Sequence, residues 1–365
     1  MKLAIIHDFL NQYGGAERVV GYFLRIFPGV PLYTSIYFPD DTFKLFRNEN
    51  ITTTFMQKIP GIRKYYKKLF FLYPRAFRSL KLRDYEILLG SSSSYSHFIN
   101  KCKDSVHINY CYTPPRFLWE TESYLTGEKV SGVMSLAARP VIHYLRKMDL
   151  RQSKRIDHYI AISEYVRNKI AKTYNRESVV IYPPIEVKKY RFRKDKDDYY
   201  IVVSRLKGYK RVDIAIEAFN ILGKKLLIVG IGEDENNLRK ISGENIKFLG
   251  SVSDSKLLDL YSRAKALVFT GREDFGLTPI EAQASGTPVV AYGEGGILET
   301  IVKGKTGFFF DKWEPGALVD VIKKFEKNPL DPVRCRENAA RFDFKNFKKG
   351  LKSFINDVYK ERFVS

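Results

Sequence analysis

The chain has 365 residues, which exceeds one ordinary domain core and predicts two domains. Hydrophobic residues make up 44% and charged residues 28%, a composition that excludes disordered and low-complexity classes. The net charge of +21 predicts polyanionic partners, namely nucleic acid, an anionic membrane surface or phosphorylated substrates.

Cysteine usage and hydropathy predict a reducing, cytoplasmic compartment. The three cysteines, Cys102, Cys111 and Cys335, are too few and too scattered for a disulfide framework, and no C-x-x-C pair indicates a zinc site. The opening MKLAIIHDFL fits a buried strand better than a signal peptide, and no stretch approaches the roughly 18 apolar residues of a spanning helix.

The first half of the chain begins like an α/β domain. A strand over 3–9 leads to a turn at Gly14 and Gly15 and then to a helix over 16–27. Further elements are less distinct. We expect strands at 86–93 and 107–112 and helices at 133–150 and 163–174.

The second half alternates apolar runs with amphipathic segments of helix length. Continuous Val, Ile and Leu runs are typical of parallel strands buried on both faces, so we expect a parallel sheet with helices on both sides. The expected strands are 199–204, 225–230, 246–250, 266–270, 288–292 and 307–310. Between the halves, Pro183-Pro184 and a charged run over 181–198 predict the interdomain linker.

The segment GREDFGLTPIEAQASG, residues 271–286, follows an expected strand. Open α/β sheets bind ligands at the carboxyl ends of their strands. Thr278 as N-cap, Pro279 as first helical residue and Glu281 three residues after the cap predict a capping box. Backbone N–H groups near Phe275, Gly276 and Leu277 would then meet a phosphate at the positive helix end.

Two carboxylates flank this turn. A capping role explains Glu281 as well as ligand binding does, and a solvated acid on the loop explains Glu273 equally well. Together they could hold hydroxyls of different parts of one extended ligand.

A second basic signal is SRLKGYKRVD, residues 204–213. Arg205 and Lys210 lie across a Gly-containing turn that leads from strand to helix, a spacing that could bring both cations onto one pyrophosphate. The alternative is a pair of surface cations in a basic protein.

These segments, with YGGAERVV and SGTPVVAYGEGG, resemble a retaining nucleotide-sugar glycosyltransferase of family 4 over nearly the whole chain. CYTPPRFLW and VIYPPIE resemble the mannosyltransferases of prokaryotic surface polysaccharide synthesis. The resemblance implies the α/β GT-B architecture, with two Rossmann-like domains whose parallel sheets face each other across a cleft and a C-terminal helix that crosses back to the first domain. We expect an acceptor domain of 1–184 plus 345–365 and a donor domain of 185–344.

The resemblance also implies roles for individual residues. Arg205 and Lys210 match the cations that hold the donor diphosphate, Glu273 the carboxylate on donor-sugar hydroxyls, and Glu281 the ribose ligand. The remaining donor-binding candidates are Phe275, Gly276, Leu277, Thr278, Gly14 and Gly15, the last two in a loop that closes over the donor.

The first domain departs from the family pattern at one position. Relatives often carry a His near the reacting carbon, where this chain has Tyr112. His97 is a substitute candidate, although a lone His is more often structural, and Arg116 is a further acceptor-side candidate.

The chemistry requires compensation of the negative charge that grows on the leaving diphosphate. The only D-x-D pattern, Asp195 and Asp197, lies in the charged linker and is interpreted as solvated. Arg205, Lys210 and the helix end can supply the compensation without metal or cofactor. The resemblance implies retention of configuration, with the departing phosphate taking the acceptor proton.

Residues 58–83 contain nine basic side chains and no acid. Helical spacing of aromatic and aliphatic residues between them predicts an interfacial helix on an anionic membrane surface. The alternative is a basic amphipathic helix packed on its own domain. A lipid-pyrophosphate-linked acceptor would account for both charge and aromatics, and would make the protein peripheral on the inner face of the cell membrane.

The favoured function is transfer of a hexose, with mannose from GDP-mannose preferred, to a glycan or lipid-linked acceptor. A nucleotide-sugar epimerase or a sugar phosphorylase would share the fold. A non-enzyme alternative is a basic membrane-surface or nucleic-acid-binding protein, but no nucleic-acid module is recognisable and we expect no nucleic-acid partner.

Overall fold

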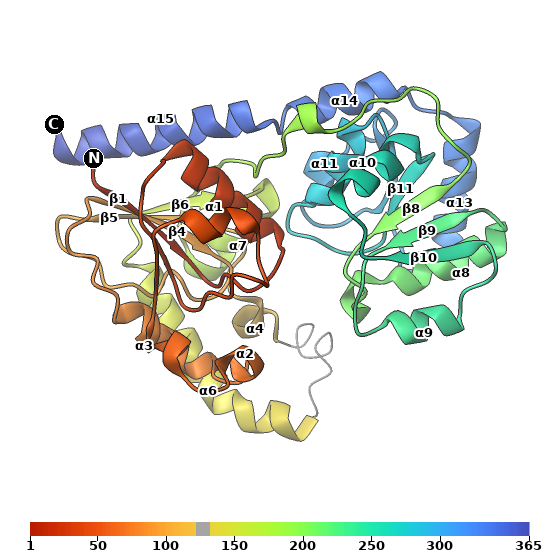
Figure 1. Cartoon of the computed structure of the whole chain (residues 1–365). Helices are drawn as coiled ribbons and strands as arrows, with labels where there is room; N and C mark the ends of the chain where they lie inside the picture. The colour runs from red at the N-terminus through yellow and green to blue at the C-terminus, as the bar shows by residue number, and fades with distance from the viewer. Residues whose placement is uncertain (122–131, 365) are drawn as a thin grey trace. The chain divides into compact units, whose positions relative to one another are not determined.

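The computed structural model describes residues 1–121 and 132–364, and of residues 132–138 the backbone alone. The chain forms two compact units, Met1–Tyr182 with Lys348–Ser365, and Pro183–Phe347 (Figure 1). The divisions lie within a few residues of the predicted 184 and 345.

The first unit contains a seven-stranded sheet in the order β3-β2-β1-β4-β5-β6-β7. All its pairings are parallel, and β1 lies between β2 and β4. The strands are β1 (Leu3–His7), β2 (Leu32–Thr34), β3 (Ile51–Thr53), β4 (Ile87–Ser92), β5 (Val106–Cys111), β6 (His158–Ala161) and β7 (Val179–Val180).

Four of these strands, β2, β3, β6 and β7, were not expected from the sequence. β2, β3 and β7 are two or three residues long, too short to display a period-2 or continuous apolar pattern, and β6 (HYIA) begins with a polar residue. β2 and β6 pair with the longer strands β1 and β5, and β3 and β7 pair in turn with β2 and β6.

Helices pack on the first sheet. Phe23 of α1 contacts Tyr110 of β5 edge to face, with ring centroids 5.4 Å apart. Phe77 of α3 lies in a separate core cluster with Ile6 of β1 and Leu88 of β4. The helices of this unit are α1 (Gly15–Ile26), α2 (Ile62–Tyr65), α3 (Tyr73–Arg78), α4 (Arg116–Trp119), α6 (Gly132–Ser153) and α7 (Glu164–Tyr174).

The second unit contains a six-stranded parallel sheet in the order β10-β9-β8-β11-β12-β13. Its strands are β8 (Tyr200–Val203), β9 (Leu226–Val229), β10 (Ile246–Gly250), β11 (Ala266–Phe269), β12 (Val289–Tyr292) and β13 (Gly307–Phe310). All six expected strands are present. They are four or five residues long, and most are uninterrupted apolar runs that are buried along their length, which leave a clear signal.

Helices cover both faces of this second sheet (Figure 1). Residues of α8 and α13 share one core cluster with the strands, and residues of α10 and α11 share another. The helices are α8 (Val212–Leu222), α9 (Glu235–Lys240), α10 (Asp254–Arg263), α11 (Leu277–Ala284), α12 (Ile297–Thr300), α13 (Pro315–Lys327) and α14 (Pro332–Ala340). The predicted α/β class with two parallel sheets is confirmed.

The last helix, α15 (Phe344–Phe363), begins in the second unit and continues into the first from residue 348. Tyr359 donates to Glu86 Oε1 at 3.3 Å, and Arg362 donates to the carbonyl of Lys103 at 3.2 Å. The predicted return of the C-terminal helix to the first domain is thereby confirmed. The predicted cleft between the sheets stays a prediction.

The predicted linker over 181–198 is largely wrong. Ile185 is 1% exposed and bonds through its backbone to Phe342 and Phe344. Lys196 donates to the carbonyl of Ser262 in the last turn of α10 and to that of Ser285, the C-cap of α11. A positive charge at the C-terminal end of a helix is stabilising. These contacts make the segment part of the second unit.

Burial lowers the pKa of Lys196 from 10.5 to about 8. The unfolded chain therefore binds this proton more tightly than the folded protein does between these pH values, and folding releases it. As the pH rises from 8 to 10.5, the free energy of unfolding of the wild-type protein should rise by up to about 3 kcal/mol relative to that of Lys196→Met. Urea titrations at several pH values measure this, with exposed Lys194→Met as control. Parallel pH curves for Lys196→Met and wild type would contradict it.

Candidate donor site and first-unit polar network

The strand order of the second sheet reverses between β8 and β11. In open α/β sheets, ligands bind at the carboxyl ends of the strands beside such a reversal. The loop after β8 carries Arg205 and Lys210, and the loop after β11 carries Glu273. The structure therefore brings the two predicted segments to one edge of the sheet.

Lys210 and Glu273 form an ion pair between Nζ and Oε1, with side chains 12% and 23% exposed. Thr270 ties their loops together, since its Oγ1 donates to the carbonyl of Lys210 at 2.9 Å. The indole of Trp313 in turn donates to the carbonyl of Thr270 at 3.0 Å. Thr270 and Trp313 were not singled out by the sequence, because neither belongs to a recognisable motif. Arg205 lies exposed earlier in the same β8 loop.

The start of α11 differs from the predicted capping box. Gly276 is the N-cap, with φ of 92° and ψ of 78°, and Leu277 is the first helical residue. Thr278 is therefore inside the helix and caps nothing with its side chain. The left-handed conformation that glycine permits starts the helix earlier than the sequence pattern indicates. The backbone N–H groups of the first turn are still at this end of the helix.

Glu281 is 6% exposed and accepts a hydrogen bond from the Tyr261 hydroxyl at 3.1 Å. This bond links the carboxylate to Tyr261 of α10. Phe275 is buried, with its ring 5.5 Å from that of Phe342. Glu273, two residues earlier in the same loop, has a side chain that is 23% exposed.

Gly296 supports the Glu273 loop from the next strand connection. Its N–H donates to the carbonyl of Glu273 at 2.9 Å. A Cβ on Gly296 would lie 2.1 Å from the carbonyl oxygen of Asp274, so only glycine allows this approach. The sequence GEGG over residues 293–296, which ends in Gly296, is the feature that could have indicated this close approach.

In the first unit, Gly14 is the N-cap of α1 and Gly15 its first residue. A Cβ on Gly14 would lie 2.2 Å from Glu17 Oε2. Tyr112 is buried and its hydroxyl donates to the carbonyl of Ala16 at 3.1 Å, with Ser91 Oγ 3.0 Å away. Burial raises the pKa of Tyr112, so it remains protonated. Tyr112 thus holds the start of α1.

His97 lies in a buried network. Its Nδ1 is 3.0 Å from Ser92 Oγ, and its Nε2 is 2.6 Å from Asp149 Oδ1. Asp149 Oδ2 accepts from Trp119 Nε1 at 2.7 Å and from the Tyr174 hydroxyl at 2.8 Å. Both ring nitrogens of His97 are engaged, which favours the structural role over a contact with substrate.

Arg116, the third acceptor-side candidate, is half-buried at the start of α4. This short helix is held by α6, because Arg146 Nε donates to the carbonyl of Leu118 at 2.5 Å and its Nη2 donates to Thr121 Oγ1 at 2.9 Å.

The predicted interfacial helix over 58–83 is wrong as one continuous element. The segment is broken into α2, a 3-10 turn over Phe70–Leu72 and α3. Ile62 and Tyr73 are buried in the first unit's core, and Tyr66, Leu69 and Phe70 pack against it. Gly61 and Pro74 interrupt the helical pattern. Tyr65 and Phe71 remain 41% and 50% exposed.

The interpretation of the D-x-D pattern as solvated holds for Asp195 but not for Asp197. Asp195 is exposed, whereas Asp197 pairs with Arg263 at 2.6 Å. Within residues 1–121 and 132–364, no group of three or more His, Cys, Asp and Glu side chains is placed to hold a metal ion. In that same part of the chain, no helix is both long enough and apolar enough to cross a bilayer.

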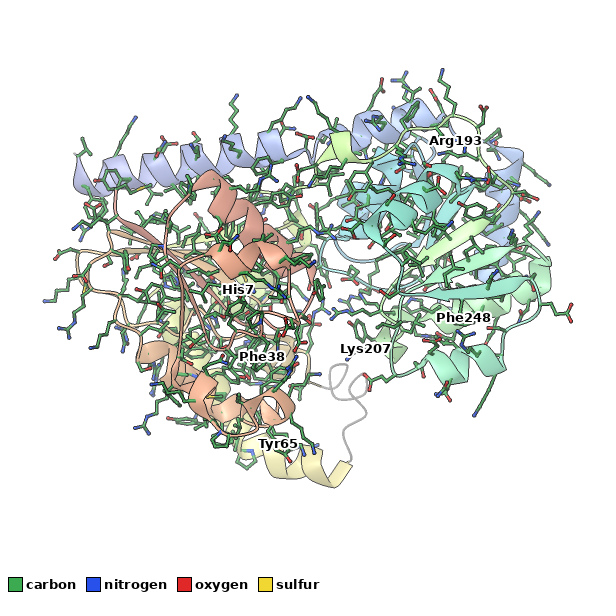
Figure 2. The ribbon with its side chains drawn as sticks, in the orientation of Figure 1. His7, Phe38, Tyr65, Arg193, Lys207 and Phe248 are labelled. Atoms are coloured by element: carbon green, nitrogen blue, oxygen red, sulfur yellow. The ribbon has the colours of Figure 1, made fainter. Side chains whose placement is uncertain are left out.

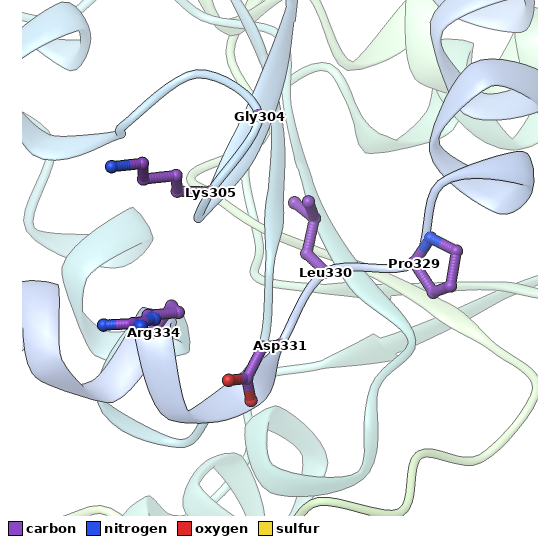
Figure 3. Close-up of a pocket in the computed structure, with 6 residues that line it drawn as sticks. All are labelled: Gly304, Lys305, Pro329, Leu330, Asp331 and Arg334. Carbon is purple, nitrogen blue, oxygen red and sulfur yellow. The ribbon is translucent and has the colours of Figure 1, made fainter.

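A cavity of about 320 Å³ lies in the second unit between the β13 approach and α14 (Figure 3). Gly304 and Lys305 precede β13, so the cavity is at the amino ends of the strands, opposite the edge that carries Lys210. Its other lining residues are Pro329, Leu330, Asp331 and Arg334. It is separate from the candidate donor site.

Comparison with known proteins finds glycosyltransferases among the relatives of this chain. Residues 185–342 match the family model described as Glycosyl transferases group 1. The O-antigen chain mannosyltransferase RfbU of Salmonella typhimurium is 28% identical over 233 residues, which are 60% of this chain and 65% of that protein.

Solved structures share the fold across the whole chain. Anabaena Alr3699/HepE in complex with UDP and glucose has a TM-score of 0.70 at 16% identity, covering 98% of this chain and 99% of its own. Sucrose-phosphate synthase of Thermosynechococcus elongatus has a TM-score of 0.73 at 16% identity, covering 98% and 100%. The architecture is GT-B, and the chain resembles family 4 glycosyltransferases.

The Asp149 network predicts a large stability effect. Asp149→Ala leaves three buried donors without their acceptor and should lower the free energy of unfolding by about 3 to 5 kcal/mol. Exposed Asp104→Ala should change it by less than about 0.5 kcal/mol. Chemical denaturation followed by circular dichroism measures both. Equal effects of the two variants would show that the network contributes little.

Proposed function

We propose that this chain, whose residues 185–342 match the glycosyl transferases group 1 model, is a metal-independent retaining hexosyltransferase. It would move a hexose, with mannose from GDP-mannose favoured, to a glycan or lipid-linked acceptor in surface polysaccharide or glycolipid synthesis. The observation that carries this proposal is the Lys210–Glu273 pair at the strand reversal, inside the region that matches the family model.

The site offers the charges that such a transfer needs. Cleavage of the bond between the anomeric carbon and phosphate builds negative charge on the leaving diphosphate. Arg205, Lys210 and the amino end of α11 provide fixed positive charge at one edge. Glu273 is placed to accept hydrogen bonds from donor-sugar hydroxyls.

In the proposed reaction, the acceptor oxygen bonds to the anomeric carbon on the face that the diphosphate leaves. The carbon–oxygen bond to phosphate breaks, and the departing phosphate takes the acceptor proton. Configuration is retained, and no separate protein base is required. The name of RfbU, a mannosyltransferase, supports mannose as the transferred sugar.

Lys210→Ala should lower kcat by about 10² to 10³ if this cation stabilises the leaving charge. Exposed Lys225→Ala is the matched control and should leave kcat unchanged. Release of nucleotide diphosphate is measured with and without acceptor. Release only with acceptor supports transfer over epimerisation or phosphorolysis. Near-wild-type kcat in Lys210→Ala would remove this residue from the mechanism.

Membrane association is a further part of the proposal, with the protein on the cytoplasmic face of the cell membrane. Tyr65 and Phe71 are exposed, and the ammonium groups of Lys64 and Lys68 lie 5.4 and 5.7 Å from the centroid of the Tyr65 ring. Aromatic rings beside cations suit an anionic headgroup layer.

Flotation with vesicles that contain anionic lipid tests this surface. At about 1 kcal/mol for each cation, changing residues 64, 67 and 68 to Ala should weaken binding about 100-fold. The control changes three exposed lysines of the second unit, at 323, 324 and 327. Wild-type protein that stays with the unbound fraction would contradict membrane association without affecting the donor site.

A further inference from the structure

The first sheet also reverses its strand order, between β1 and β4. This is the position that holds Lys210 and Glu273 in the second sheet, and the rule that ligands bind beside such reversals applies to both. His7 ends β1 there, and α1 begins a few residues later with Glu17 in its first turn. Figure 2 labels His7 within the first unit.

His7 and Glu17 are 2% and 1% exposed. His7 Nδ1 lies 3.2 Å from the carbonyl of Ser91 and 3.0 Å from its Oγ. Because a carbonyl oxygen only accepts, Nδ1 carries a proton. The other ring nitrogen, Nε2, is 3.9 Å from Glu17 Oε1, close enough for an ion pair but too far for a direct hydrogen bond.

The surrounding charges favour a doubly protonated imidazole. Burial lowers the pKa of His7, whereas the Glu17 carboxylate, the charge of Asp8 and the Ser91 carbonyl raise it, and the raising contributions prevail. Asp8 is itself satisfied by the N–H groups of Ser93, Tyr95 and Ser96. Tyr112, which directly follows β5, lies 3.0 Å from Ser91 Oγ, and burial raises the pKa of its hydroxyl, so it stays neutral. The proton on Nε2 is therefore held to higher pH than on a free histidine, and in that protonated form Nε2 is a donor beside Glu17.

The Glu17 oxygen that faces His7 Nε2, Oε1, accepts a hydrogen bond from Gln12 Nε2 at 2.8 Å. Among the residues that the structure describes, neither His7 Nε2 nor Glu17 Oε2 has a hydrogen-bond partner. Oε2 lies against the backbone of Gly14, where a Cβ would be only 2.2 Å away. Gly14 is half-exposed and Gly15 exposed. Gln12 belongs to the segment 11–15, so displacement of this segment would free Glu17 Oε1 from its present partner.

The chemistry of the pair selects its ligand. His7 Nε2 and Glu17 Oε1, which are 3.9 Å apart, can both reach one hydroxyl oxygen at about 2.8 Å once Gln12 has left Oε1, since a hydroxyl accepts and donates at once. The two carboxylates of Asp8 and Glu17 outnumber the single cation, which disfavours phosphate. An uncharged carbohydrate hydroxyl matches these constraints better than an anion.

We propose that His7 and Glu17 bind a hydroxyl group of the acceptor sugar, with the segment 11–15 displaced on binding. This inference rests on the proposed glycosyltransferase function and deepens it. It assigns the His7–Glu17 pair of the first unit to a sugar hydroxyl of the acceptor. Any phosphate that the acceptor carries would bind elsewhere.

The test uses the full chain labelled with ¹³C at histidine Cε1, with His7→Gln identifying the His7 signal. Methyl α-D-mannopyranoside, methyl α-D-glucopyranoside and inorganic phosphate are titrated separately. At least one glycoside should change the chemical shift of the His7 signal, and phosphate should leave that chemical shift unchanged. Glu17→Gln should weaken glycoside affinity at least 10-fold, while exposed Glu177→Gln should not change it.

Donor binding is measured in parallel by thermal shift with nucleotide diphosphate sugars. If glycosides leave the wild-type His7 signal unmoved, or phosphate moves it equally, the hydroxyl site is overturned. Unchanged glycoside affinity in Glu17→Gln overturns it too. If Glu17→Gln does not fold, the wild-type titrations and glycoside binding by His7→Gln decide. Absence of any donor shift in wild type would instead contradict the proposed function.

Discussion

The fold places a cation and a carboxylate in contact at the edge where the second sheet reverses its strand order, and the proposed chemistry depends on this contact. Lys210 and Glu273 come from loops after different strands. Thr270, Trp313 and Gly296 fix those loops by donating hydrogen bonds to backbone carbonyl oxygens. Sheet topology therefore decides which charges meet, and the supporting residues decide how closely.

Much of the second unit could be predicted from its sequence, because most of its strands are uninterrupted apolar runs such as LLIV and ALVF. Short strands such as β2 and β7 could not, since two or three residues carry no periodicity. The capping box failed for a local reason. Gly276 adopts a left-handed conformation that starts α11 at Leu277, and the sequence pattern of Thr278 and Glu281 fitted a later start equally well.

The candidate residues of the first unit were harder to predict, because their partners are distant in sequence. His97 is bound to Asp149, 52 residues away, and His7 contacts Ser91, 84 residues away. Nothing in HDF or GGAE indicates that His7 and Glu17 face each other. The prediction of one continuous helix over 58–83 was wrong for a related reason, since Ile62, Tyr66 and Tyr73 pack into their own domain while Tyr65 and Phe71 stay exposed.

A crystal structure of the chain with a bound nucleotide diphosphate sugar tests the central claim most directly. The account predicts the diphosphate at the carboxyl edge of the second sheet, within hydrogen-bond distance of Arg205 or Lys210 and beside the amino end of α11, with sugar hydroxyls on Glu273. A diphosphate bound at another edge, with Arg205, Lys210 and Glu273 all out of reach, would contradict it.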